Sequence, residues 1–89
     1  MKAVITVTGK DGVGIIAKVS SECFLHKVNI VDITQSVLGE FFAMIMLVEI
    51  ESLDIPFADF ADILDALGKE NSLVISTMHE DIFNSMHKI

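Results

Sequence analysis

Three glycines close together give one short segment the properties of a ligand-binding loop. They belong to Gly9-Lys10-Asp11-Gly12-Val13-Gly14, which follows a run of alternating apolar residues. Glycine lets the backbone approach a ligand closely, and the start of a following helix carries partial positive charge. The segment is therefore suited to a small anion or a carboxylate. Its G-x-x-G-x-G spacing is neither the dinucleotide fingerprint nor a phosphate-binding loop.

The alternative interpretation of this loop is purely structural. Gly9 and Gly12 would supply turn conformations, and Asp11 would cap the helix that follows. Asn29 favours the ligand, because we expect Asn29 and Ile30 to open the next strand beside the loop, at the same end of the sheet. Backbone amides, the Asp11 carboxylate and the Asn29 side chain would then surround one cleft. An amino acid suits this set, since its carboxylate can meet the amides and its ammonium group Asp11.

The other reactive side chains form no catalytic or metal-binding pattern. His26, His79 and His87 lack the i, i+4 spacing of a helical zinc site. Cys23 falls on an apolar helical stripe, where we expect an inert buried thiol. A phosphate-binding hydrolase of this size would need an arginine, and the sequence contains none. We expect no catalytic residue, no metal site, no cofactor and no enzymatic activity.

The charge balance argues against polyanionic partners. All six basic residues are lysines, and thirteen acidic residues give a formal net charge of −7. Nucleic acids and anionic membrane surfaces attract positive charge, so we expect neither as a partner. The single cysteine and the absence of a signal-peptide pattern indicate the cytoplasm. The longest apolar run, 41–48, is far shorter than the ~20 residues of a membrane span.

The elements that must position these residues follow strand and helix periodicities in turn. Alternating or continuously apolar runs predict four strands, over 3–8, 29–37, 41–48 and 73–78. Ile16, Val19 and Cys23 recur at helical spacing, as do the apolar residues after Pro56. The predicted helices cover 15–27, 56–70 and 82–89, with Pro56 in the first turn of the second.

This order predicts a single domain over residues 1–89. Its fold class is α/β, a ferredoxin-like βαββαβ sandwich in which a four-stranded antiparallel sheet carries two helices on one face, followed by a short C-terminal helix. The first and third strands lie in the centre, and the second lies at an edge. Hydrophobic residues make up 52% of a chain of only 89 residues, which leaves apolar surface for another subunit. We therefore expect a homodimer or a larger assembly.

Two stretches resemble the ACT domain family. The family's first strand, ligand loop and first helix are similar to Ile5-Thr6-Val7-Thr8-Gly9-Lys10-Asp11-Gly12-Val13-Gly14-Ile15-Ile16-Ala17-Lys18-Val19, and the start of its second strand to Val28-Asn29-Ile30-Val31-Asp32. The resemblance covers nearly the whole chain and is nearest to small stand-alone bacterial ACT proteins of uncharacterised function. Many relatives have a proline where this chain has Val13.

The resemblance implies a regulatory or sensor module that binds a small molecule, an amino acid in most cases, at a dimer interface. The ligand would contact Gly9, Lys10, Asp11, Gly12, Val13, Gly14, Ile15, Asn29 and Ile30. A regulated enzyme or regulator protein would receive the signal. The alternative is a protein-interaction or assembly subunit of the same fold that binds no ligand.

Overall fold

The chain forms four strands and three helices in the predicted order. The computed structural model describes residues 1–10 and 12–87, apart from the side chain of Leu38. The strands are β1 (Lys2–Gly9), β2 (Asn29–Leu38), β3 (Phe41–Glu49) and β4 (Leu73–His79). The helices are α1 (Ile15–Leu25), α2 (Phe57–Glu70) and α3 (Glu80–Met86). No helix among these residues is long and apolar enough to cross a membrane.

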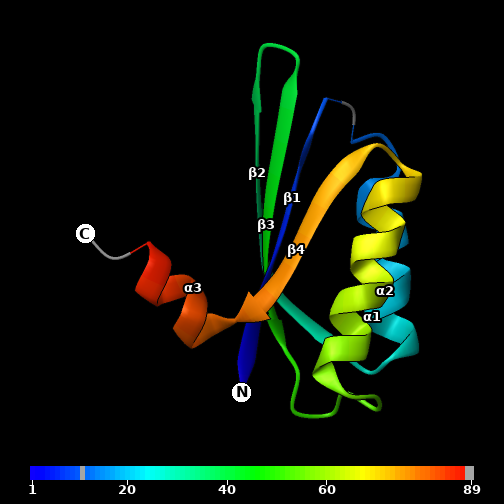
Figure 1. Cartoon of the computed structure of the whole chain (residues 1–89), viewed down its shortest axis with the longest axis vertical. Helices are drawn as coiled ribbons and strands as arrows, with labels where there is room; N and C mark the ends of the chain where they lie inside the picture. Colours follow the sequence, from blue (N-terminus) through cyan, green and yellow to red (C-terminus); the bar gives the residue numbers. More distant parts are fainter. Residues whose placement is uncertain (11, 88–89) are drawn as a thin grey trace.

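The strands pair into one antiparallel sheet in the order β2-β3-β1-β4. Helices α1 and α2 cover one face of it, and α3 lies on the opposite side (Figure 1). The ferredoxin-like fold is confirmed, with β1 and β3 central and β2 at an edge as predicted.

The core lies between the sheet and the two long helices. In β1 every second residue faces it, and Ala3, Ile5 and Val7 are completely buried. The other main contributions are Met44, Met46 and Val48 from β3, and Phe60 and Leu64 from α2. In α1 the buried stripe is Ile15, Val19 and Cys23, so Ile16, which the sequence placed on this stripe, instead remains 36% exposed. Ile16 is also at helical spacing from Val19 and Cys23, but it lies about 100° around the helix from Ile15 and therefore at the edge of the buried stripe.

The ends of the helices have local causes. Helix α1 begins after Gly14, whose backbone is left-handed with φ 76°, and it ends where Lys27 takes a left-handed φ of 61°. Pro56 lies one residue before α2 rather than in its first turn. Its carbonyl accepts hydrogen bonds from the amides of Asp59 (3.0 Å) and Phe60 (3.2 Å).

Strand β2 departs from simple alternation. The register with β3 shifts between Ile30 and Asp32, which leaves Val31 as the extra residue of a β-bulge. Val31, Ile33 and Val37 are 48%, 37% and 69% exposed. The strand therefore carries apolar side chains outside the area that α1 and α2 cover.

The second face of the sheet is partly covered by the chain itself. Val4 points away from the core cluster yet is only 4% exposed, and α3 packs against β1 and β4 on that side (Figure 1). Ile45 and Val74 remain 44% and 68% exposed. Helix α3 contacts β1 and β4, so the chain covers part of this face itself and leaves Ile45 of β3 uncovered.

Candidate ligand-binding site

The loop between β1 and α1 is packed tightly against the β-sheet. A Cβ atom on Gly12 would lie 2.7 Å from the ring of Phe42 in β3, and one on Gly9 would collide with the side chain of Leu73 in β4. A Cβ atom at either position would force a neighbouring side chain to move, so close packing favours glycine at both. This supports the structural interpretation of these two residues.

At the start of α1, by contrast, the glycine is not closely packed. A Cβ atom on Gly14 would have no neighbour within 4 Å, so here only the positive φ favours glycine. The amide of Ile15 donates to the Gly12 carbonyl (3.1 Å), and that of Lys18 to the Gly14 carbonyl (3.2 Å). Val13 and Lys10 are exposed beside this turn. The predicted contacts of Asp11 lie outside the described residues and stay predictions.

The charge at the start of α1 distinguishes it from the other two helices. The first turn of α2 contains Asp59, and that of α3 contains Glu80 and Asp81, whereas the first turn of α1 has no acidic residue. Acidic side chains at these positions offset the positive end of a helix dipole. The positive end of α1 is therefore not offset from within its own first turn, and it can attract a carboxylate.

Asn29 and Ile30 do not lie beside this loop within one chain. Asn29 pairs with Glu49, which pairs with Lys2 at the start of β1, while the loop follows Gly9 at the other end. At about 3.3 Å per residue, the two ends are separated by roughly 23 Å of strand. The predicted single cleft is wrong for one chain, because α1 runs back along the sheet and β2 starts where β1 starts. Asn29 is exposed and Ile30 is half-buried.

A second feature accompanies Asn29. The surface formed by Val31, Ile33 and Val37 of β2 with Ile16 and Phe24 of α1, named here the β2–α1 flank, is apolar and exposed; Phe24 is 83% exposed. Lys18 Nζ donates to Asn71 Oδ1 at 2.7 Å, so the Lys18 side of α1 faces the end of α2. Helical spacing puts Ile16 and Phe24 on the other side of α1. No motif or periodicity in the sequence indicated this flank.

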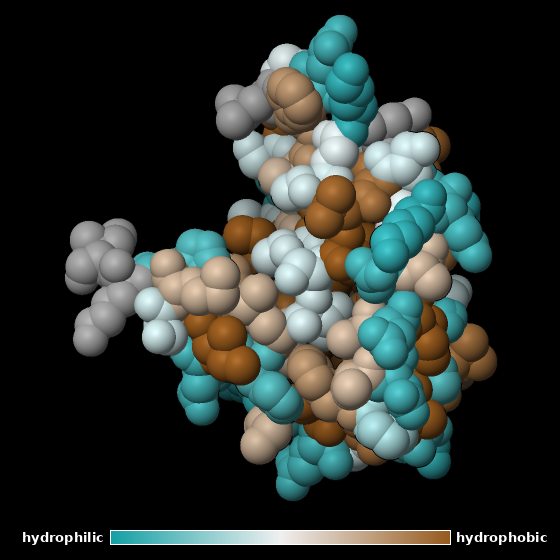
Figure 2. All heavy atoms as spheres, in the orientation of Figure 1, coloured by the Kyte–Doolittle hydropathy of each residue, from teal (hydrophilic) through white to brown (hydrophobic). Residues whose placement is uncertain are grey.

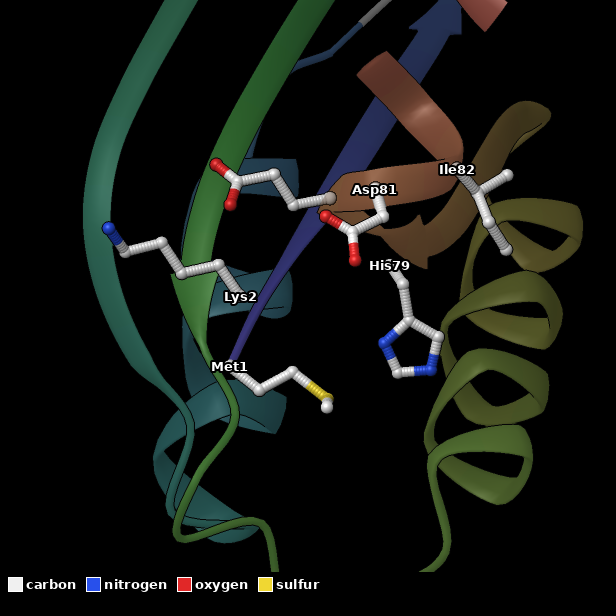
Figure 3. A pocket seen from close by; sticks show the side chains of 6 residues that line it. Met1, Lys2, His79, Asp81 and Ile82 are labelled. Atoms are coloured by element: carbon white, nitrogen blue, oxygen red, sulfur yellow. The ribbon is translucent and has the colours of Figure 1, made fainter. Parts of the chain in front are cut away.

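A pocket of about 530 Å³ lies at the opposite end of the molecule from the loop. Met1, Lys2, His79, Glu80, Asp81 and Ile82 line it. Figure 3 shows Asp81 and His79 at the junction of β4 and α3 beside Met1, with the Lys2 ammonium group pointing away from them. The His79 ring stacks on Phe57 at 4.1 Å. No sequence motif indicated this pocket, whose lining carries charges of both signs.

Cys23 is the most clearly inert of the reactive groups. Burial, and secondarily the neighbouring Glu22 carboxylate, raise the pKa of its thiol to about 11. The thiol is therefore protonated at neutral pH, as expected for a structural residue. Among the described residues, no three His, Cys, Asp or Glu side chains are grouped closely enough to hold a metal ion.

Comparison with known proteins agrees with the fold. The sequence model of the ACT domain family matches residues 2–76. A UPF0237 protein of Clostridium perfringens is 47% identical over 89 residues, the full length of both chains. An ACT domain protein from Streptococcus pneumoniae superposes with a TM-score of 0.80 at 37% identity, covering 93% of each chain. A putative glycine cleavage system transcriptional repressor gives a TM-score of 0.67 at 26% identity, and the match covers 85% of this chain and 43% of the repressor. The chain therefore belongs to the ACT domain family and resembles its small UPF0237 members.

Proposed function

We propose that this protein is a regulatory or sensor module that binds a small molecule, an amino acid by the chemistry of its site, between two copies of the chain. ACT domains are in general regulatory modules that bind small molecules. The similar glycine cleavage repressor is itself described as a transcriptional regulator. We infer that here, too, the output passes to another protein, an enzyme or a regulator.

One observation carries the proposal: the candidate site residues lie at opposite ends of the sheet, and β2, the edge strand that connects these ends, pairs only with β3 among the described residues and exposes three apolar side chains between polar ones. Homodimers mostly have a two-fold axis, and two identical edge strands related by such an axis pair antiparallel. That pairing sets the start of β2 in one copy beside the end of β2 in the other. Asn29 of one copy then lies at the same end as the β1–α1 loop of its partner.

The β2–α1 flank supplies the driving force for this pairing. Long exposed edge strands with apolar side chains tend to pair with another strand. Val31, Ile33 and Val37 extend along the edge, and Phe24 stands beside it on α1. Burying these side chains in a second copy would remove from water the largest apolar residues of this side.

The proposed contacts distinguish the two ends of an amino acid. The positive end of α1 and the nearby Lys10 would bind the carboxylate, and Asp11 would bind the ammonium group. The partner's Asn29 would contribute its side-chain amide, and Ile30 beside it would contact apolar atoms of the ligand. The proposed role of these residues is recognition without catalysis.

The test is a screen of the twenty amino acids by thermal unfolding, combined with a size measurement. A ligand at a hundred times its dissociation constant should add about 2.7 kcal/mol to the free energy of unfolding. We expect a selective rise in melting temperature for a dimer. A dimer whose stability no amino acid changes would instead favour the assembly subunit that binds no ligand, which the apolar flank also suits.

Two variants then test whether the site is shared. Asn29→Ala and Lys10→Ala should each weaken binding by about 1–3 kcal/mol, while Asn84→Ala, an exposed asparagine on α3, should not. A mixed dimer of the two variants has one doubly altered site and one intact site, so binding should return at one of the two sites of each mixed dimer. Failure of the mixture to recover any binding, with mixed dimers present, would contradict a shared site.

A further inference from the structure

A groove between α1 and α2 lies on the side of α1 opposite the β2–α1 flank. It has a volume of about 310 Å³ and is lined by Glu22 of α1 and by Ile63, Ala66, Leu67 and Glu70 of α2. Ile63 and Leu67 are half-buried and Ala66 is exposed, so the floor is apolar and open. One glutamate from each helix borders it.

The two glutamates are not neutralised by the chain itself. Among the described residues, neither Glu22 nor Glu70 takes part in an ion pair. Lys18 donates its hydrogen bond to Asn71 instead, and Lys69 forms an ion pair one turn back along α2. The Lys18 ammonium group is bonded beside Glu70, but the two glutamates outnumber it, so the border of the groove keeps a net negative charge.

Residues next to the groove add further acidic and apolar side chains. Asp59 and Asp62 are exposed on α2 one turn before Ile63 and Ala66, which places acidic groups on the same side of the helix. Leu25, three residues after Glu22, is 61% exposed and adds an apolar side chain on the same side of α1. Figure 2 shows hydrophilic residues along the side of the molecule where α2 lies, with hydrophobic residues beside them.

We propose that this groove docks an amphipathic helix of another protein, one with an apolar stripe bordered by lysine or arginine. An apolar strip between two helices matches the i, i+4, i+7 anchors of a docked helix. The acidic border matches cationic neighbours of those anchors, and such complementarity sets specificity and association rate.

A second copy of this chain does not fit the groove. Its own helices carry acidic residues beside their apolar stripes, and its formal net charge is −7, so like charges would face each other. The short α3 has Glu80 and Asp81 in its first turn, which rules it out for the same reason. The occupant is therefore a different, basic protein. The proposal goes beyond ligand binding and uses the side of α1 that a β2-paired dimer leaves free.

The groove alone is smaller than a stable protein interface, so the association should be transient and weakened by salt. A suitable probe is a synthetic labelled helix of about 16 residues with leucines at i, i+4 and i+7 and lysines beside them. Its control has the same composition with the leucines distributed around the helix. Fluorescence anisotropy at low salt should show about tenfold tighter binding of the striped peptide. Equal binding of both peptides would overturn the proposal, because it would indicate charge attraction without a groove.

Matched variants locate the contact. Glu22→Lys with Glu70→Lys should weaken binding of the striped peptide about tenfold. Glu40→Lys with Glu51→Lys changes the net charge equally at exposed sites away from the groove and should have less than about a twofold effect. Ala66→Gln should obstruct the apolar floor, whereas Ala58→Gln, also exposed on α2, should not. Equal losses in the groove variants and their controls would exclude this surface.

Discussion

The two edges of the sheet are built differently. At one edge, β4 is seven residues long, its Leu73 and Ile75 are buried, and α2 packs along it (Figure 1). At the other edge, β2 is ten residues long, carries a bulge, and touches α1 at only a few points. Helix α2 thus lies along β4, whereas β2 has few contacts with α1 and leaves apolar side chains exposed.

This difference separates stability from association. Free energy of folding comes from apolar groups that leave water within the chain, and these gather beneath α2 and the adjoining half of α1. The apolar groups of the β2–α1 flank remain in water and contribute only if another molecule covers them. The comparison therefore predicts that substitutions near β4 unfold the domain and that substitutions near β2 change its assembly.

The largest expected effect on the free energy of unfolding is at Phe60, a buried phenylalanine, and Phe24 near the β2 edge is its exposed counterpart. Phe60 of α2 is completely buried, and Phe60→Ala should lower the free energy of unfolding by about 3–5 kcal/mol. Phe24 of α1 is 83% exposed, and Phe24→Ala should change it by less than about 0.5 kcal/mol in the monomer. Urea unfolding at dilute protein measures both. A similar loss of unfolding free energy for the two variants would show that Phe24 packs against the domain and is not exposed.

The features that the sequence predicts are likewise those of the buried core, and the features that it does not predict lie on the exposed β2 side. The strands and helices were predictable because residues such as Ile5, Val7, Phe60 and Leu64 repeat with the period of the element that buries them. The bulge at Val31 had no glycine to indicate it. The exposed flank was missed because periodicity shows which side chains face a core and does not show where the covering helices end.

The site was harder to predict than the fold. The loop after β1 was recognised from its glycines, yet the close packing of Gly9 on Leu73 and of Gly12 on Phe42 accounts for these two glycines without a ligand. The predicted position of Asn29 was wrong for one chain. The predicted element order already implied the correct position, because a helix that crosses back along the sheet starts both flanking strands at the same end. Sharing of the site between two chains was therefore open to deduction, and it stays a prediction.

A smaller effect is expected where α2 meets β4. A Cβ atom on Gly68 would lie 2.9 Å from the Leu73 carbonyl oxygen and 2.9 Å from Ile75 Cγ1. Gly68→Ala should therefore lower the free energy of unfolding by about 1–3 kcal/mol, although alanine favours a helix by about 1 kcal/mol over glycine. Chemical denaturation gives the sign directly. Stabilisation by alanine would mean that α2 can move away from β4 at little cost. The β4 edge would then be less tightly packed than the comparison of the two edges assumes.

The smallest expected effect on stability, and the most informative about assembly, is a charge placed at either edge. Lysine on an exposed edge strand opposes pairing with another strand. Ile33→Lys, at a residue 37% exposed on β2, should raise the dissociation constant of the proposed dimer at least about tenfold while leaving the monomer folded. Val74→Lys, at a residue 68% exposed on β4, is the matched control and should leave the dimer intact. Sedimentation equilibrium distinguishes the two variants. If Val74→Lys dissociates the dimer and Ile33→Lys does not, the copies meet through β4 or the second face of the sheet. That result would also contradict a site shared between the β1–α1 loop and the partner's Asn29.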